Sequence, residues 1–187
     1  MKKKIAAVVV LVALAVMSIS GTMAYYTADN IATNVITSGN IKIDQVEMDK
    51  TSDGELVPFE NKDGVMPGDQ ISKIVTVKNT GDNPAYIRVA VSQIVTLANG
   101  QISGEGNAHI KCDFNTTDWT YKDGYYYYNE ALAAGAETEP LFTTVAFSAA
   151  MGNVFQNCTA KIDVSAFAVQ VKNNGANVFE AAGWPVE

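Results

Sequence analysis

Apolar and polar residues alternate with a period of two on both sides of a turn-forming cluster in the middle of the chain. The alternating runs are residues 71–79 and 85–91, with Val75 and Val77 on one face of the first and Ile87, Val89 and Val91 on one face of the second. Because successive side chains of a β-strand point to opposite faces, the pattern predicts two strands, with Lys78 and Arg88 on their polar faces. Between them, Gly81 is suited to a left-handed turn and Pro84 cannot donate to a ladder, so strand pairing should pause there.

Further β-type runs, separated by clusters of Gly, Asn, Asp and Pro, follow along the rest of the chain. They cover residues 34–48, 56–57, 119–121, 125–128, 141–149 and 161–171. Residues 98–113, rich in Gly and polar side chains, are expected to form a long inserted surface loop, and residues 176–183 one or two helical turns. Nothing after the first 24 residues has the extended 3.6-residue period of an amphipathic helix. Short strands of this kind predict an all-β fold, an antiparallel β-sandwich.

The run at residues 34–48 does not fit a strand with one buried face. Ile41 and Ile43 share one face, whereas Val46 and Met48 fall on the opposite parity. The pattern predicts either a β-bulge near residues 44–45 or a strand that is covered on both faces.

The clearest local prediction is a β-hairpin at residues 119–128. Asp123 and Gly124 separate two aromatic-rich runs and supply the positive φ values that a two-residue hairpin turn requires. Four consecutive tyrosines, residues 125–128, place two rings on each face of the second strand. Either all four fill space in the sandwich, or the outer two are available to stack on a partner.

The first 24 residues have the plan of a secretory signal peptide. Three lysines precede an uninterrupted apolar run of 13 residues, 5–17, and the leader ends at the small residue Ala24. Cleavage between Ala24 and Tyr25 would remove the leader helix and leave residues 25–33 as a polar N-terminal arm before a domain of residues 34–187. Thirteen residues fall short of the roughly 20 that a membrane-spanning helix needs, but extension to Ala24 gives about enough length, so an uncleaved anchor is the alternative.

The charge balance argues against nucleic acid as a partner. The leader holds three of the 13 basic side chains and none of the 20 acidic ones, so residues 25–187 carry a net charge near −10. Such a surface repels nucleic acid and anionic lipid, which leaves an uncleaved leader as the expected route to a membrane. The acidity fits solubility in an extracellular setting.

The two cysteines, Cys112 and Cys158, are a candidate disulfide. An even number of cysteines in an exported protein is typical of a bridge, which for a loop of this size would contribute up to about 4 kcal/mol. Neither residue belongs to a Cys-x-x-Cys pair, the arrangement typical of metal and redox sites. Two buried thiols are the alternative.

Residues that could carry catalysis are sparse. The single histidine, His109, has no second histidine to complete a zinc site, and the chain contains neither His-Glu-x-x-His nor Gly-x-Ser-x-Gly. Asp49, Asp53 and Glu55 have a spacing that could contact calcium, but turn formation explains them better. We therefore expect no enzymatic activity, no cofactor and no metal site.

A series of short motifs runs from the end of the leader nearly to Trp184. In chain order they are residues 21–27 (GTMAYYT), 34–43 (NVITSGNIKI), 66–69 (MPGD), 77–81 (VKNTG), 84–89 (PAYIRV), Trp119, 123–128 (DGYYYY), 140–142 (PLF) and 168–170 (AVQ). In this order they resemble the TasA/camelysin family, biofilm matrix proteins that Gram-positive bacteria export with a SipW-type signal peptidase.

The resemblance implies a jelly-roll-like β-sandwich and assembly into extracellular matrix fibres. In such fibres the N-terminal segment of one subunit inserts as a strand into the next, so the partner is a second copy, head to tail, and an accessory matrix protein is a further candidate. Here the polymerisation strand would contain Tyr25, Tyr26, Asn34, Val35, Ile36, Ile41 and Ile43. The alternative is that Ile41 and Ile43 belong permanently to the subunit's own sheet and only residues 25–33 are exchanged.

The expected function is therefore a secreted structural subunit of extracellular matrix fibres, located in the matrix or at the cell surface. Through camelysin the family also carries a metalloprotease label, although this chain lacks a set of metal-ligating histidines. A cell-surface metalloprotease and a monomeric adhesin that uses exposed tyrosines are the alternatives.

Overall fold

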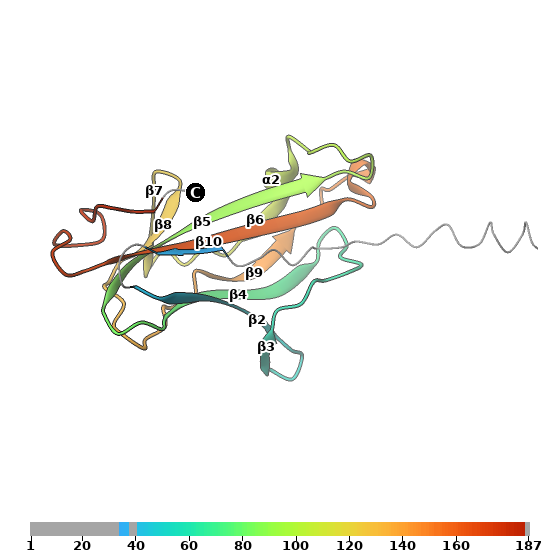
Figure 1. Cartoon of the computed structure of the whole chain (residues 1–187). Helices are drawn as coiled ribbons and strands as arrows, with labels where there is room; N and C mark the ends of the chain where they lie inside the picture. The colour runs from blue at the N-terminus through green and yellow to red at the C-terminus, as the bar shows by residue number, and fades with distance from the viewer. Residues whose placement is uncertain (1–33, 38–40, 186–187) are drawn as a thin grey trace, which may run out of the picture.

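The computed structural model describes residues 34–37 and 41–185, which form two five-stranded sheets packed face to face (Figure 1). The strand order is β1-β10-β5-β8-β7 in sheet A and β3-β2-β4-β9-β6 in sheet B. The strands are β1 (Asn34–Thr37), β2 (Ile43–Lys50), β3 (Leu56–Pro58), β4 (Gln70–Asn79), β5 (Ala85–Thr96), β6 (Ile110–Cys112), β7 (Trp119–Lys122), β8 (Tyr125–Tyr128), β9 (Phe142–Phe147) and β10 (Thr159–Gln170). Helical structure in this part of the chain is limited to α2 (Gly106–His109) and the 3-10 turn η1 (Asn153–Phe155). The predicted all-β sandwich is confirmed.

The chain crosses from sheet B to sheet A at the predicted turn around Gly81. β4 and β5, the two strands expected there, lie in different sheets and do not pair with each other. Val75 and Val77 of β4 are fully buried, as are Ile87 and Val89 of β5, and all four belong to the main core between the sheets. The alternating pattern therefore identified the buried faces of both strands correctly.

Asn79 holds this crossing in place. Its Nδ2 donates to the carbonyl oxygens of Asn83 (2.9 Å) and Leu132 (3.1 Å), and its Oδ1 accepts from the N–H of Gly81 (3.0 Å). Gly81 does not adopt the left-handed conformation that we expected. A Cβ at this position would lie 3.0 Å from the backbone nitrogen of Lys42, so the close approach of two chain segments is what favours glycine.

The predicted strand over residues 34–48 is divided between the two sheets. β1 joins sheet A, where it runs parallel to β10, whereas β2 joins sheet B and pairs with β4. The expectation of a purely antiparallel sandwich is therefore wrong at β1. The register of β2 with β4 is unbroken from Ile43 to Met48, so no bulge forms, and Val46 and Met48 are half-buried as a strand covered on both faces requires.

The expected inserted loop at residues 98–113 is only partly irregular. It contains the single helical turn α2 and then β6, which pairs with β9 at the edge of sheet B. Ile110, opposite Phe147, is buried in the main core. The three-residue strand β6 was not predicted, because the segment that contains it is polar and rich in glycine.

The β7–β8 hairpin is confirmed. Lys122 pairs with Tyr125, so Asp123 and Gly124 form a two-residue turn with φ values of +51° and +87°. Positive φ at both central residues defines the type I′ turn that Asp-Gly favours. Tyr126 and the other three tyrosines of β8 pack against apolar clusters on both faces of the strand, which supports the space-filling alternative.

Residues 171–185 cover part of the outer face of sheet A instead of forming the helical turns expected at residues 176–183. In Figure 1 this segment, in red, returns to the β7–β8 hairpin. Together with sheet A it encloses a second apolar cluster, whose buried members are Tyr86, Tyr127, Val169 and Val178. The Trp184 ring lies 5.9 Å from the ring of Tyr127, centroid to centroid.

Candidate assembly interface

β1 forms one edge of sheet A and is the first strand of the described chain. It pairs with β10 over four residues, from Asn34 opposite Ser165 to Thr37 opposite Ala168. All other strand pairs within the described residues are antiparallel. Val35 is half-buried and packs against the main core. A parallel ladder of four residues is weak compared with the 12-residue ladder that joins β10 to β5.

β10 has a longer edge than β1 covers. Each of its 12 residues pairs with β5 on one side, but on the other side only residues 165–168 pair with β1. No described residue forms a ladder with residues 159–164 on that side. Unpaired backbone N–H and C=O groups in a row are a template for pairing with another strand.

The other strands at sheet edges offer fewer backbone groups for pairing with another strand. β3 and β6 are three residues long, and β3 ends in Pro58, which has no N–H to donate. β7 is a four-residue strand ending in Lys122, and its Tyr121 is 63% exposed. Short strands, proline and lysine are features that discourage edge-to-edge association. The free part of β10, residues 159–164, is twice as long as β3 or β6 and contains no proline, although it carries Lys161, which forms an ion pair with Asp163.

An apolar cleft of about 470 Å³ lies where β10 begins. Its walls are the loop before β4, residues 64–67, and residues 151–158 around η1. Met66 is 62% exposed at this cleft, whereas Phe155 is buried. Cys158, which immediately precedes β10, also lines it. The free edge of β10 therefore leads directly to an open apolar cleft.

The predicted polymerisation strand is divided by the structure. Val35 and Ile36 lie in β1 on sheet A, whereas Ile41 and Ile43 are buried in the main core, Ile43 at the start of β2 in sheet B. Within the single chain, Ile41 and Ile43 thus lie in the subunit's own core, as the alternative requires, and which residues are exchanged stays a prediction. The predicted cleavage site at Ala24 and Tyr25, and Tyr26, lie outside the described residues.

Arg88, expected on a polar face, is instead buried with 8% of its surface exposed. Its guanidinium carbon lies 3.9 Å from the ring centroid of Tyr125, 4.7 Å from that of Trp184 and 5.3 Å from that of Phe167. One of its terminal nitrogens donates to the carbonyl oxygen of Pro185 (3.0 Å). Sequence reasoning missed this aromatic enclosure because the three rings come from positions far from Arg88 and from one another in the chain.

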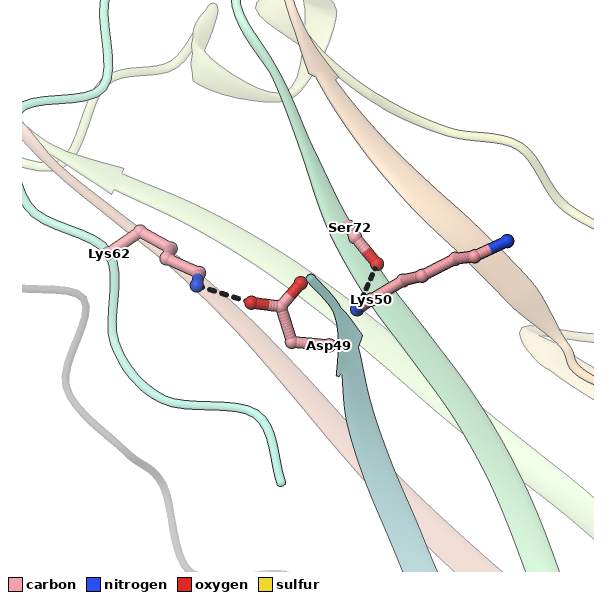
Figure 2. Close-up of polar contacts among 4 residues, drawn as sticks. All are labelled: Asp49, Lys50, Lys62 and Ser72. Atoms are coloured by element: carbon pink, nitrogen blue, oxygen red, sulfur yellow. Dashed lines mark hydrogen bonds and ion pairs between the residues drawn. The ribbon is translucent and has the colours of Figure 1, made fainter. Parts of the chain in front are cut away.

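The carboxylates considered for calcium do not gather. Figure 2 shows Asp49 of β2 pointing toward Lys62, with which it forms an ion pair, while the N–H of Lys50 donates to Ser72 Oγ of β4 (2.9 Å). Asp53 and Glu55 are exposed in the turn that follows. The Asp49 carboxylate is therefore paired with Lys62, and the hydrogen bond from the Lys50 N–H to Ser72 joins the end of β2 to β4.

The two cysteines do not form the predicted disulfide in this structure. Cys112 Sγ accepts a hydrogen bond from Gln93 Nε2 (3.2 Å), and Gln93 pairs with Ile162 of β10. Burial raises the pKa of the Cys112 thiol to about 11, although the hydrogen bond from Gln93 acts in the opposite direction.

His109 ends α2, and its ring packs edge-on against Phe155 at 4.8 Å between centroids. Within residues 34–37 and 41–185, no three His, Cys, Asp or Glu side chains are grouped so that they could hold a metal ion. In the same part of the chain, no helix is both long enough and apolar enough to span a membrane. The absence of enzymatic activity remains a prediction.

Comparison with protein-family models, with curated proteins and with solved structures found no match for this chain.

Proposed function

We propose that the protein is a secreted structural subunit of extracellular matrix fibres, and that it polymerises by exchanging its N-terminal strand. The observation that carries the proposal is β1, a four-residue parallel strand at the edge of sheet A. The signal-peptide pattern of residues 1–24 and the ordered motifs of the chain support export and assembly. The jelly-roll connectivity that the resemblance implies is part of this proposal.

Exchange of β1 replaces contacts within one subunit by the same contacts between two. In the monomer, β1 occupies the β10 edge of its own sheet, and in the fibre it occupies that edge in the neighbouring subunit. Each subunit then donates one strand and accepts one, so the contact is heterologous and the chain of subunits can grow without closing. The sandwich itself stays intact because Ile41 and Ile43 keep the following segment in the main core.

The first test is electron microscopy of the purified leader-free protein, residues 25–187, over a range of concentrations. We expect filaments above a critical concentration. A protein that stays monomeric at all concentrations and salt conditions contradicts the fibre function.

The second test locks β1 in place. In a background with Cys112→Ser and Cys158→Ala, Asn34→Cys and Ser165→Cys put two thiols at paired positions of the β1–β10 ladder. Neighbouring strands are about 4.8 Å apart, within the range of a disulfide. Oxidation of the monomer should abolish filament growth, and reductant should restore it.

The matched control mixes two proteins that each carry one of these cysteines. If β1 is exchanged, their filaments should give disulfide-linked dimers on oxidation, and the Asn34→Cys protein alone should give none. Undiminished filament growth by the fully oxidised double variant refutes exchange of β1, even if the protein proves to be a fibre subunit.

A further inference from the structure

The free edge of β10 and the register of β1 together define where the chain preceding β1 can pair. Asn34 lies opposite Ser165, an offset of 131 residues, and the same offset holds for every pair through Thr37 and Ala168. If the parallel ladder continues toward the N-terminus, Thr33 lies opposite Val164 and Ala28 opposite Thr159. Residues 28–33 thus match residues 159–164, the six residues of β10 that precede the β1 ladder and have no partner on this side.

The side chains of this segment fit such a continuation. Residues two apart on a strand share a face, so Ile31 and Thr33 lie on the face of Val35, which packs against the main core. Ile31 would lie opposite Ile162, a half-buried residue that also packs against this core. The one branched aliphatic residue of the arm therefore faces an apolar neighbour.

The ladder must end where β10 begins. Asn157, just before the strand, has a φ of +57°, so the backbone of β10 turns away there and no longer offers an extended partner. If the ladder continues in this register, Tyr25 and Tyr26, three and two residues before Ala28, would lie beyond it and beside the cleft formed by residues 64–67 and 151–158. Tyrosine suits an open apolar cleft, because its ring can be buried while its hydroxyl group stays in water.

We propose that the chain's own N-terminal arm, residues 25–33, extends β1 along the free edge of β10 and seats Tyr25 and Tyr26 in the apolar cleft at its end. The arm is the occupant that the structure favours, because it is continuous with a strand already on this edge and its length matches the gap. It covers the most accessible backbone edge of the resting subunit. This arrangement concerns the monomer and does not require that the protein forms fibres.

Site-directed cross-linking at low protein concentration tests the register. In leader-free protein with Cys112→Ser and Cys158→Ala, Ile31→Cys with Ile162→Cys should form a disulfide within one chain. Two mismatched pairs serve as controls, Ile31→Cys with Ala160→Cys and Ile31→Cys with Val164→Cys. Each control keeps the same face but shifts the partner by two residues, about 6.6 Å along the strand, so it should cross-link at least tenfold more slowly.

Intact mass and non-reducing gels identify the product. A monomer that has lost two hydrogens supports the proposal. Equal cross-linking of all three pairs, or none in the matched pair, overturns it. Disulfide-linked dimers in dilute protein also overturn it, since the arm would then occupy a second copy and not its own chain.

Hydrogen exchange tests the cleft without new cysteines. With the arm docked, the amides of residues 159–164 that point away from β5 should be protected from exchange. The double variant Tyr25→Ser, Tyr26→Ser should increase the exchange rate of these amides at least tenfold. Tyr121→Ser, which removes an exposed tyrosine from β7, is the matched control and should leave these amides unchanged. If the amides that point away from β5 are unprotected in the unmodified protein, the proposal is contradicted.

Discussion

Arg88 is a charged side chain that packs among aromatic rings between sheet A and the C-terminal segment. Three rings surround the guanidinium group, and the carbonyl oxygen of Pro185 accepts one of its N–H groups, but Nε has no hydrogen-bond partner among the described residues. A guanidinium is weakly hydrated and stacks on aromatic faces, so it tolerates this position better than an ammonium would. The arginine therefore joins sheet A to the C-terminal segment.

Replacing this arginine should release that segment. We expect Arg88→Ala to lower the free energy of unfolding by about 2–3 kcal/mol, because cation–π contacts in a desolvated site are lost together with the packing of the aliphatic stem. Urea unfolding measures the change, and Trp184 fluorescence should shift to longer wavelength. Lys122→Ala, at the hairpin turn, is the control. An unchanged tryptophan spectrum in folded Arg88→Ala contradicts the role assigned to Arg88.

The thiol of Cys112 should react slowly in the folded protein. A thiolate is the reactive form, and a pKa of about 11 in place of the usual value near 8.5 lowers the thiolate fraction at pH 8 roughly 200-fold. Iodoacetamide labelling followed by mass spectrometry measures the rate, with protein unfolded in urea as the control. Labelling at the unfolded rate contradicts a buried, hydrogen-bonded thiol.

At the scale of elements, Asp113 attaches one edge strand of sheet B. It follows β6, and its carboxylate accepts hydrogen bonds from the N–H groups of Thr143 (2.8 Å) and Thr144 (2.6 Å) and from Thr143 Oγ1 (2.6 Å). Burial alone would raise the pKa of Asp113, but these three bonds outweigh it and lower the pKa below its usual value. The ionised carboxylate therefore holds the start of β9.

This attachment should depend on pH in a defined direction. A lowered pKa in the folded state stabilises the protein at pH values above the unfolded pKa of about 3.9, and the stabilisation disappears as the pH falls through the folded value. We expect Asp113→Asn to cost about 1 kcal/mol at pH 7, and the difference from the unmodified protein to be smaller at pH 2 than at pH 7. Urea midpoints at both pH values measure it, with Asp53→Asn in an exposed turn as the control. A difference that is equally large at pH 2 would mean that the charge is not the cause.

The elements differ in how far the sequence determines them. The β7–β8 hairpin was predictable because Asp123 and Gly124 encode their own turn geometry and the two strands are adjacent in the chain. Residues 34–37 were predicted as part of a strand, but the separation of β1 from β2 and its parallel pairing with β10 were not. The same apolar residues can pair with any free edge, and β10 lies more than 120 residues away. The candidate interface follows the same division. Val35 and Ile36 of β1 were named from the sequence, whereas the β10 edge and the cleft depend on tertiary packing.

At the scale of the molecule, the N-terminal region connects the two sheets. β1 contributes to sheet A and β2 to sheet B, so the chain bridges the sandwich before the crossing at Asn79 does so again. Loss of β1 from sheet A would leave β2 attached through its own ladder to β4. This separation allows a strand to be exchanged while the main core persists.

The charge of the whole molecule should control the rate of that exchange. Residues 25–187 carry a net charge near −10, so two subunits repel each other as they approach. Screening lengths fall from about 30 Å at 0.01 M salt to about 10 Å at 0.1 M. We therefore expect filament growth, followed by light scattering and checked by electron microscopy, to accelerate severalfold over this range of sodium chloride. The stapled Asn34→Cys, Ser165→Cys protein is the control for non-specific salting out, because it should not scatter at either concentration. Growth that slows with added salt would indicate attractive contacts between charged groups at the interface, contrary to exchange between uniformly acidic subunits.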